Sequence, residues 1–455
     1  MMTLAPFVHA FEIKEDMVCL YNSLTLKKIF LKKTEYELLI KNLKANNRNK
    51  ITDLLENAGF ILNKKLDYEA LMVRYAKAIL PARINIANFF VVLTDQCNYD
   101  CKYCYIERPL RKNCSENKAM SLDTAKLVLK SVLNNSDVST KAKLNFYGGE
   151  PLLNKEIMLF LLKEVTQKRP NIRPQIVTNG SLVTEEIAEI LKKYNVFTTV
   201  SLDGWEELNN KARVFIDGRP TFEDTMRGIK ILQKHGVLDA ISCTVSVHNY
   251  NRLVEVIEFF KDMGIRNVGM NYLIRDTLSG STLDPEVVAE NMFDAFLRAN
   301  EIGIFEGTIG DKRAKHLWLE KPRRTDCTGC GTQIYYSPKG LMGPCQAFHW
   351  SKDEQVPIDP DLKASNHPLW QKWAKRTPYN LKECFNCEAL GVCGGGCPYN
   401  SYVLYGDMNK LDDDYCKFMK RIMRRLLQYY YDAEIKNKTG FGIQQGPSAS
   451  QDSLC

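Results

Sequence analysis

Apolar residues between positions 88 and 275 alternate between two periods. In some stretches they recur every three to four positions, as in SLDTAKLVLKSVL (121–133) and FEDTMRGIKILQKHG (222–236), which is typical of amphipathic helices. Short runs of strand type lie between these, at 88–95, 143–149, 174–179, 197–203, 239–246 and 267–274. Six strand and helix units in succession predict an α/β fold with parallel strands, either an open sheet or a curved partial barrel.

Start and stop signals support these helices. Ser121 and Thr184 each stand just before a helical stretch, where a hydroxyl can cap the first turn. Gly236 and Gly264 follow two other helical stretches and are typical of helix ends.

The two ends of the chain follow other patterns. Residues 9–31 predict short alternating strands, and 34–45 and 50–62 predict two helices, which together indicate a small module of strands packed on helices. After residue 275 the sequence becomes rich in Cys, Gly and Pro, as in folds organised by metals. From residue 438 onward the composition predicts a disordered tail.

The composition indicates the broad class of protein to which the chain belongs. With 455 residues, 45% of them apolar and 25% charged, the chain predicts a globular protein of two or three domains. No apolar run approaches the ~20 residues of a membrane span, and the N-terminus lacks a signal core, so we expect a cytoplasmic protein without a membrane partner. The net charge of +8 is spread along the chain, which favours solvated helix faces over a nucleic-acid site.

Cysteine is unusually frequent, with 15 residues, and in a reducing compartment clustered thiols indicate metal ligands. Cys97, Cys101 and Cys104 lie in the stretch CNYDCKYCY directly after the first predicted strand, at the end where α/β barrels carry active sites. Three thiolates on a 4Fe–4S cluster leave one iron open, and that iron can bind the amine and carboxylate of S-adenosylmethionine. The alternative is a structural zinc site with a fourth ligand elsewhere.

The C-x3-C-x-aromatic-C spacing resembles that of the radical S-adenosylmethionine (SAM) superfamily, over residues ~88–275. Further stretches match that family in order: GGEP (148–151), TNG (178–180), SLDG (201–204) and an arginine in NNKARVF. The resemblance implies an aromatic contact to adenine, a backbone contact to the methionine amine, a ribose contact and an arginine near the carboxylate. The residues it implies are Tyr103, Gly148, Gly149, Glu150, Thr178, Asn179, Ser201, Asp203 and Arg213.

A second cysteine group lies between residues 327 and 416. Its pattern of C-x12-G-x4-C, then C-x2-C-x5-C-x3-C, then a final Cys resembles the SPASM extension, which carries auxiliary iron–sulfur clusters in peptide-modifying radical enzymes. The resemblance implies a first auxiliary cluster on Cys327, Cys345 and Cys397, and a second on Cys384, Cys387, Cys393 and Cys416.

The first auxiliary set is one ligand short, and Cys330 lies one turn from Cys327. If Cys330 binds, both auxiliary clusters are closed; if it does not, an open iron is left for a substrate thiolate. Two zinc sites on the same thiols are the alternative. Of the other cysteines, we expect Cys19 and Cys243 to pack in cores, Cys114 to be a loop thiol and Cys455 to end the tail.

Residues 1–80 resemble the winged-helix-like recognition elements of peptide maturases, which bind a leader peptide as an added strand. The alternatives are a purely structural cap, or a DNA-binding winged helix in an iron–sulfur or zinc regulator.

We therefore expect a recognition module at 1–80, a radical SAM partial (β/α)6 barrel at 88–305, a SPASM domain at 320–425 and a tail at 438–455. The implied cofactors are three 4Fe–4S clusters and SAM. The implied partners are a precursor peptide with a leader and a donor such as flavodoxin or ferredoxin.

The expected reaction joins a cysteine sulfur of the precursor to a carbon. The alternatives are a carbon–carbon crosslink or the formation of formylglycine in a sulfatase. The sequence identifies no general base, because each of several histidines has a plain structural or surface interpretation: His235, His248, His316, His349 and His367.

Overall fold

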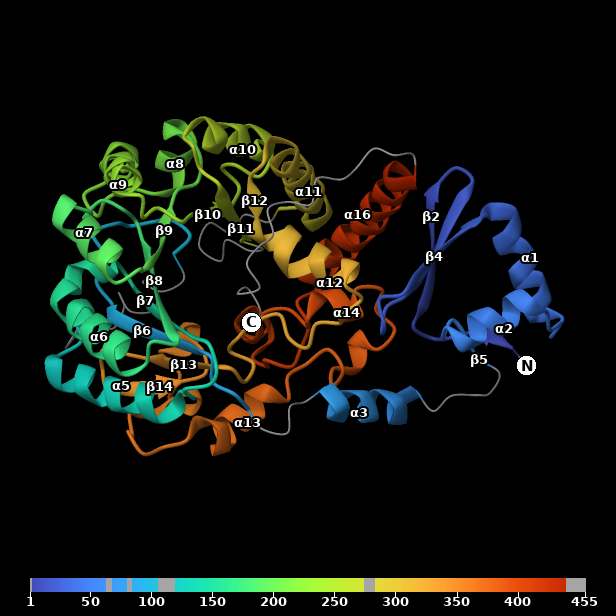
Figure 1. Cartoon of the computed structure of the whole chain (residues 1–455), viewed down its shortest axis with the longest axis horizontal. Coiled ribbons are helices and arrows are strands. Elements are labelled where there is room, and N and C mark those ends of the chain that lie inside the picture. The colour runs from blue at the N-terminus through green and yellow to red at the C-terminus, as the bar shows by residue number, and fades with distance from the viewer. Residues whose placement is uncertain (1, 63–67, 80–83, 105–118, 274–282, 439–455) are drawn as a thin grey trace.

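The computed structural model of the chain describes residues 2–62, 68–79, 84–104, 119–273 and 283–438. Its centre is a sheet of parallel strands, with helices on the outside (Figure 1). The strands pair in sequence order. They are β6 (Asn88–Thr94), β7 (Ala142–Gly148), β8 (Ile172–Thr178), β9 (Phe197–Ser201), β10 (Ala240–Val245) and β11 (Asn267–Tyr272). The predicted partial barrel is confirmed.

The outer helices follow the strands as the helical periodicity predicts. They are α5 (Leu122–Asn135), α6 (Lys155–Lys168), α7 (Glu185–Lys193), α8 (Glu206–Ala212), α9 (Phe222–His235), α10 (Leu253–Asp262) and α11 (Pro285–Ile302). The hydroxyl of Ser121 accepts the Thr124 N–H at 3.1 Å, and that of Thr184 accepts the Ile187 N–H at 3.3 Å. Both predicted N-caps are confirmed.

The parallel sheet is longer than the sequence predicts. Strand β12 (Phe305–Glu306) pairs with β11 at one edge, and β13 (Gln333–Tyr336) pairs in parallel with β6 at the other. Strands β14 (Leu341–Gly343) and β15 (Val356–Pro357) then continue it in antiparallel pairing. Because β13 is only four residues long, between cysteine-rich turns, no alternating pattern marks it. The cysteine-rich region thus continues the barrel sheet directly.

The remaining cysteine-rich region carries short helices joined by turns. They are α12 (Lys315–Trp318), α13 (Pro368–Ala374), α14 (Leu390–Cys393) and α15 (Pro398–Tyr405), followed by the long helix α16 (Asp413–Lys438). Figure 1 shows α16 between the barrel and the N-terminal module. The expected tail falls on residues 439–455, outside the described residues.

The N-terminal module contains a three-stranded antiparallel sheet. Its elements are β1 (Thr3–Leu4), β2 (Val8–Lys14), β3 (Met17–Asn22), β4 (Lys28–Lys32), α1 (Lys33–Lys44), α2 (Lys50–Asn57), β5 (Ile61–Leu62) and α3 (Tyr68–Ile79). Leu20 and Leu39 share one buried cluster with Tyr379 and Cys384 of the cysteine-rich region. A Cβ on Gly391 would lie 2.6 Å from a Leu26 methyl, so the two regions are in close contact.

Within the described ranges, none of the helices combines the length and the apolar character that crossing a membrane requires.

Candidate active site and auxiliary cysteine sites

The three cysteines near residue 100 lie on a loop that leaves the carboxyl end of β6. Cys97, Cys101 and Cys104 are all partly exposed. The loop main chain pairs with residues 212–216, at the end of α8 and just beyond it, through N–H···O=C bonds of 2.7 to 3.3 Å. Main-chain hydrogen bonds therefore set the position of this loop.

Tyr99 anchors the same loop from within. Its ring is 1% exposed and packs edge-on against Phe215, with 4.8 Å between the ring centres. Its hydroxyl lies 2.9 Å from the Thr225 hydroxyl. We did not predict this role, because a tyrosine between two cysteines has no distinguishing sequence signal.

Two glycines pack against the backbone at the start of the cysteine loop. Gly148 has φ +145°, and a Cβ there would lie 2.3 Å from the Thr94 carbonyl oxygen. A Cβ on Gly149 would lie 2.2 Å from the Gln96 carbonyl oxygen. Both positions therefore require glycine. Glycine is required because these positions lie against the backbone that leads into the cysteine loop. The sequence alone does not reveal this contact.

Glu150 ties two strand ends together. It is fully buried, and its carboxyl accepts the Thr178 O–H at 2.7 Å and the Asn179 N–H at 2.8 Å. Burial raises its pKa to about 7, although these hydrogen bonds act in the opposite direction. The side chain is thus engaged inside the protein.

Asn179 connects this network to the first cysteine. Its Nδ2 donates to Cys97 Sγ at 3.9 Å and to Asn98 Oδ1 at 2.9 Å. The Tyr99 N–H also points to Cys97 Sγ, at 3.4 Å. Such donors stabilise a thiolate, which is the form that binds iron.

Asp203, Arg213 and Tyr103 form one buried network. Arg213 donates to the Asp203 carboxylate from Nε at 2.9 Å and from Nη2 at 3.0 Å, and the Tyr103 hydroxyl donates to the same carboxylate. Burial is the largest single influence and acts to lower the Arg213 pKa, but Asp203, Tyr103 and Cys101 together raise this pKa well above its ordinary value. The guanidinium lies 5.4 Å from the Tyr103 ring centre. Asp203 thus positions two of the residues expected to contact SAM.

The remaining expected contact, Ser201, is the last residue of β9 and is half-buried. Gly148 ends β7 and Thr178 ends β8. These three residues therefore lie at the carboxyl ends of adjacent parallel strands, on the side of the sheet from which the cysteine loop departs.

Four thiols of the second cysteine group come close together. Burial raises the pKa of Cys330, and the thiols of Cys327 and Cys397 raise it further. Burial likewise raises the pKa of Cys345, and all three of the other thiols act on it in the same direction. Cys330 is thus a neighbour of the three cysteines expected to hold the first auxiliary cluster.

The other four cysteines line a single cavity of about 190 Å³. Cys384, Cys387, Cys393 and Cys416 all face it, and Cys397 of the first set lies on its wall. Within the described ranges, no three Cys, His, Asp or Glu side chains are grouped tightly enough to hold a single metal ion. Four thiols around one cavity are the donor set of a closed 4Fe–4S cluster, so the residues fit the group that the sequence implies.

Three glycines separate Cys393 from Cys397. Gly394, Gly395 and Gly396 all have positive φ, of +79°, +89° and +70°. A Cβ on Gly394 would lie 2.4 Å from the Asp326 nitrogen. This turn therefore separates the two cysteines and admits only glycine at its first position.

A buried ion pair fixes both cysteine groups. Arg313 donates to the Asp326 carboxylate and to the Tyr415 hydroxyl, each at 2.7 Å. Asp326 precedes Cys327, and Tyr415 precedes Cys416. The network spans three segments, and for that reason the sequence did not reveal it.

The remaining cysteines and two of the histidines have structural or surface positions. Cys19 and Cys243 are buried in strands β3 and β10, as predicted, and Cys114 and Cys455 lie outside the described residues. His235 pairs with Glu185 at the surface. The buried Nε2 of His349 has no partner among the described residues.

Comparison with known proteins identifies the barrel. A family model described as "Radical SAM superfamily" matches residues 91–260. The radical SAM cyclopropyl synthase TigE of Paramaledivibacter caminithermalis is 25% identical over 356 residues, covering 74% of this chain and 73% of the relative. The serine-type anaerobic sulfatase-maturating enzyme of Bacteroides thetaiotaomicron is 23% identical over 371 residues, covering 72% and 86%.

Solved structures share the fold. The structure of anSMEcpe with bound AdoMet and Cp18Cys peptide matches 76% of this chain and 99% of its own, with a TM-score of 0.64 and 20% identity. Streptococcus suis SuiB bound to precursor peptide SuiA matches 91% and 100%, with a TM-score of 0.56 and 17% identity. At these identities the likeness concerns the fold alone.

Proposed function

Because residues 91–260 make this chain a radical SAM enzyme, we propose that it modifies a ribosomally synthesised precursor peptide. The observation that carries the proposal is the cavity lined by four cysteines beyond the radical SAM domain. The names of similar proteins support it, since they include a cyclopropyl synthase, a sulfatase-maturating enzyme and SuiB, whose structure holds a precursor peptide.

In this proposal Cys97, Cys101 and Cys104 hold the radical-forming cluster. Reduction of SAM on such a cluster supplies a 5′-deoxyadenosyl radical, which removes a hydrogen atom from a substrate carbon. Asn179 and the Tyr99 N–H hold Cys97, and the Gly148–Gly149 backbone fixes the loop.

Arg213 binds the carboxylate of SAM in this scheme. Its Nε and Nη2 donate to Asp203, so Nη1 is the nitrogen assigned to the ligand. The Asp203 carboxylate also accepts a hydrogen bond from the Tyr103 hydroxyl, which fixes the ring that we assign to the adenine. Asp203 is the positioning residue for both.

We further assign two auxiliary 4Fe–4S clusters, so that the holoenzyme has three. Cys330 completes the first with Cys327, Cys345 and Cys397, and its burial beside those thiols supports the assignment. Cys384, Cys387, Cys393 and Cys416 hold the second. All eight ligands must lose their protons on binding, because the thiolate is the form that binds iron.

The bond we propose joins a cysteine sulfur of the precursor to a carbon. The product is lighter by two hydrogen atoms: one passes to the 5′-deoxyadenosyl radical, and the other leaves as a proton, while its electron replaces the one spent in reducing SAM, which is therefore the net oxidant. A carbon–carbon bond is the second candidate, and the similarity to a cyclopropyl synthase favours it.

The partners in this proposal are a precursor with a leader, which binds the N-terminal module, and a flavodoxin or ferredoxin as electron donor. Ligand thiols require a reducing compartment, so we assign the reaction to the cytoplasm.

The test is an anaerobic assay of reconstituted enzyme with dithionite, SAM and a cysteine-containing precursor from a neighbouring gene. We expect 5′-deoxyadenosine and a peptide that has lost two hydrogens, with one fewer free thiol. A peptide with the same mass loss and all thiols free would instead establish carbon–carbon bond formation. Formation of 5′-deoxyadenosine without a change in any peptide would contradict the proposal.

A further inference from the structure

Arg376 is a buried cation whose hydrogen-bond partners are neutral. It is 2% exposed. Its Nε donates to the Met408 carbonyl, its Nη1 to the Gly396 carbonyl at 3.0 Å and its Nη2 to the Ser401 hydroxyl at 3.3 Å. No carboxylate among the described residues pairs with it. A guanidinium stays charged when it is buried, so it requires an anionic neighbour of another kind.

The groups that hold Arg376 belong to both auxiliary cysteine sets. Gly396 directly precedes Cys397 of the first set, and the Ser401 hydroxyl donates on to the Cys397 carbonyl at 3.2 Å. Gly396 and Ser401 also line the cavity of the second set. Arg376 therefore lies at the boundary between the two sets of thiols.

Thiols of both sets respond to this charge. Burial raises the pKa of Cys327 and Cys330 in the first set and that of Cys384 in the second. Arg376 acts on all three pKa values in the opposite direction. A cation lowers the pKa of a thiol by stabilising the thiolate, which is the form that binds iron. Arg376 thus favours the ligand form in both sets.

A second guanidinium lies beside the first set. Arg324 is half-buried, its Nη2 donates to the Ala374 carbonyl at 3.3 Å, and its buried Nε has no partner among the described residues. Burial lowers the pKa of Arg324, and the neighbouring Cys330 thiol opposes this effect. The buried hydroxyl of Thr377, next to Arg376 in the chain, also has no partner in the described part of the protein. Buried donors of this kind fit an anionic group held by the cysteines.

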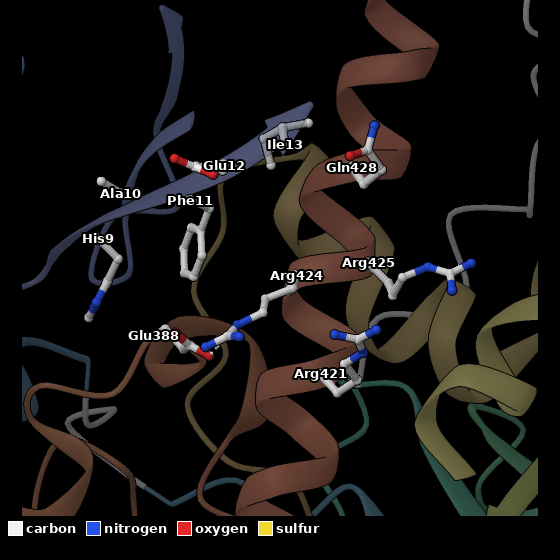
Figure 2. A pocket seen from close by; sticks show the side chains of 10 residues that line it. All are labelled: His9, Ala10, Phe11, Glu12, Ile13, Glu388, Arg421, Arg424, Arg425 and Gln428. Carbon is white, nitrogen blue, oxygen red and sulfur yellow. Dashed lines mark hydrogen bonds and ion pairs between the residues drawn. The ribbon is translucent and has the colours of Figure 1, made fainter. Parts of the chain in front are cut away.

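Other arginines of this region are paired with carboxylates. Arg313 donates to Asp326 at 2.7 Å. A groove of about 590 Å³ between strand β2 and helix α16 is lined by three arginines of that helix, all of which pair with glutamate. Figure 2 shows one of them, Arg424, reaching toward Glu388. The two guanidinium groups beside the cysteines differ from these, since neither has a carboxylate partner within the described ranges.

A cation beside an iron–sulfur cluster affects its reduction potential. A 4Fe–4S cluster on four thiolates carries a net negative charge, which grows when the cluster is reduced. Because charges interact strongly in a low-dielectric interior, a buried cation favours the reduced state over the oxidised one and raises the potential. At the radical loop, by contrast, the Asp203 carboxylate neutralises the charge of Arg213.

We propose that Arg376 is the shared counter-charge of the two auxiliary clusters, and that Arg324 adds to it at the first cluster. Neither arginine is a ligand in this role; both balance the charge of the clusters and raise their reduction potentials. The inference rests on the proposed function, because it assumes clusters on the eight auxiliary cysteines, and it adds which residues set their potentials.

The test is an EPR-monitored redox titration of the full chain, reconstituted without oxygen. The variant with Cys97, Cys101 and Cys104 replaced by Ala identifies the auxiliary signals. Arg376→Gln keeps an amide donor but removes the charge, so the midpoint potentials of both auxiliary clusters should shift downward while that of the radical cluster stays unchanged. Arg376→Lys retains the charge and should keep the potentials close to those of the wild type.

Arg169→Gln is the matched control. Arg169 also donates to neutral groups, which are the Leu133 and Lys168 carbonyls at 3.1 and 3.0 Å and the Ser136 hydroxyl at 3.2 Å. It follows helix α6 of the barrel and belongs to neither cysteine set. This variant should leave all the potentials unchanged.

Arg324→Gln tests the second guanidinium. Because Arg324 lies beside Cys330, we expect a smaller downward shift that is confined to the first auxiliary cluster. A shift of the second cluster alone would contradict this placement of the charge.

Unchanged potentials in Arg376→Gln would overturn the proposal, as would equal shifts in Arg376→Gln and Arg376→Lys or a comparable shift in Arg169→Gln. If Arg376→Gln does not retain its auxiliary iron, the iron content becomes the measurement. The proposal then expects Arg376→Lys to retain that iron, and equal loss from both variants would contradict it.

The proposed function is tested separately, by the peptide product of the wild type. Auxiliary potentials that do not respond to Arg376→Gln, in an enzyme that modifies its peptide, would reject the inference and retain the proposed function. Shifted potentials in an enzyme that changes no peptide would do the reverse.

Discussion

The two cysteine-bearing regions of this molecule are built in different ways. The loop of Cys97, Cys101 and Cys104 is held by main-chain hydrogen bonds to residues 212–216 and by two glycines packed against its entry. The auxiliary cysteines lie on turns and on helices as short as four residues, around a cavity. Hydrogen bonds and packing preorganise the first site, whereas the second depends on its ligand groups and on one buried ion pair.

This difference has a consequence for the apo protein. The cysteine loop should keep its conformation without iron, because none of the contacts named for it involves the metal. The auxiliary region should lose order without iron, since its short elements bury little apolar surface of their own.

The largest effect is expected at the buried pair behind the cysteine loop. Arg213→Ala leaves the Asp203 carboxylate buried without its partner, so the free energy of unfolding should fall by about 3–5 kcal/mol in urea titrations. The control is Lys211→Ala, which breaks an exposed pair with Glu207 and should leave the free energy of unfolding nearly unchanged. Equal losses would show that the Asp203 network does not support the site.

Glu150 should make stability depend on pH. Burial raises its pKa from 4.5 to about 7. The folded pKa exceeds the unfolded one, so the stabilisation is present below pH 4.5 and is lost as the pH rises through about 7. Between pH 4.5 and 8 the wild type should lose about 3 kcal/mol relative to Glu150→Gln. Parallel pH profiles of the two proteins in urea titrations would contradict this.

A smaller effect should separate two glycines of the auxiliary region. Gly394 and Gly406 both have positive φ, of +79° and +67°. A Cβ on Gly394 would meet the Asp326 nitrogen, whereas on Gly406 it would meet nothing within 4 Å. Gly394→Ala should therefore cost about 1–3 kcal/mol more than Gly406→Ala and lower the iron bound after reconstitution. Equal iron contents would show that the turn does not position the cysteines.

The smallest expected change is confined to one cluster. Cys330→Ala should alter the spectrum of the first auxiliary cluster while SAM cleavage without peptide continues. The control is Cys19→Ala, at a buried cysteine of β3 that belongs to neither group. An unchanged spectrum for Cys330→Ala would exclude this residue as a ligand.

The sequence predicts the barrel well, because its strands and helices have strong periodicity. Each of the six strands begins and ends within two residues of the predicted bounds. The cysteine spacing likewise groups four thiols that line one cavity, because the pattern is local. The same holds for the N-caps at Ser121 and Thr184.

What the sequence could not predict depends on contacts between distant segments. Strand β13 is recognised only through its pairing with β6. The engagement of Glu150 with Thr178, and of Arg313 with Tyr415, joins residues far apart in the chain. The groove between β2 and α16 brings together the two ends of the protein, which no local pattern encodes.

The most direct test of separate radical and auxiliary sites measures the iron and sulfide content and the 5′-deoxyadenosine formed. It compares the wild type with the variant in which Cys97, Cys101 and Cys104 are all replaced by Ala. We predict about twelve irons per wild-type chain, the content of three 4Fe–4S clusters, and about eight in the variant, with SAM cleavage abolished. Continued formation of 5′-deoxyadenosine by the variant, or loss of all its iron, would contradict the separation of one radical site from two auxiliary clusters.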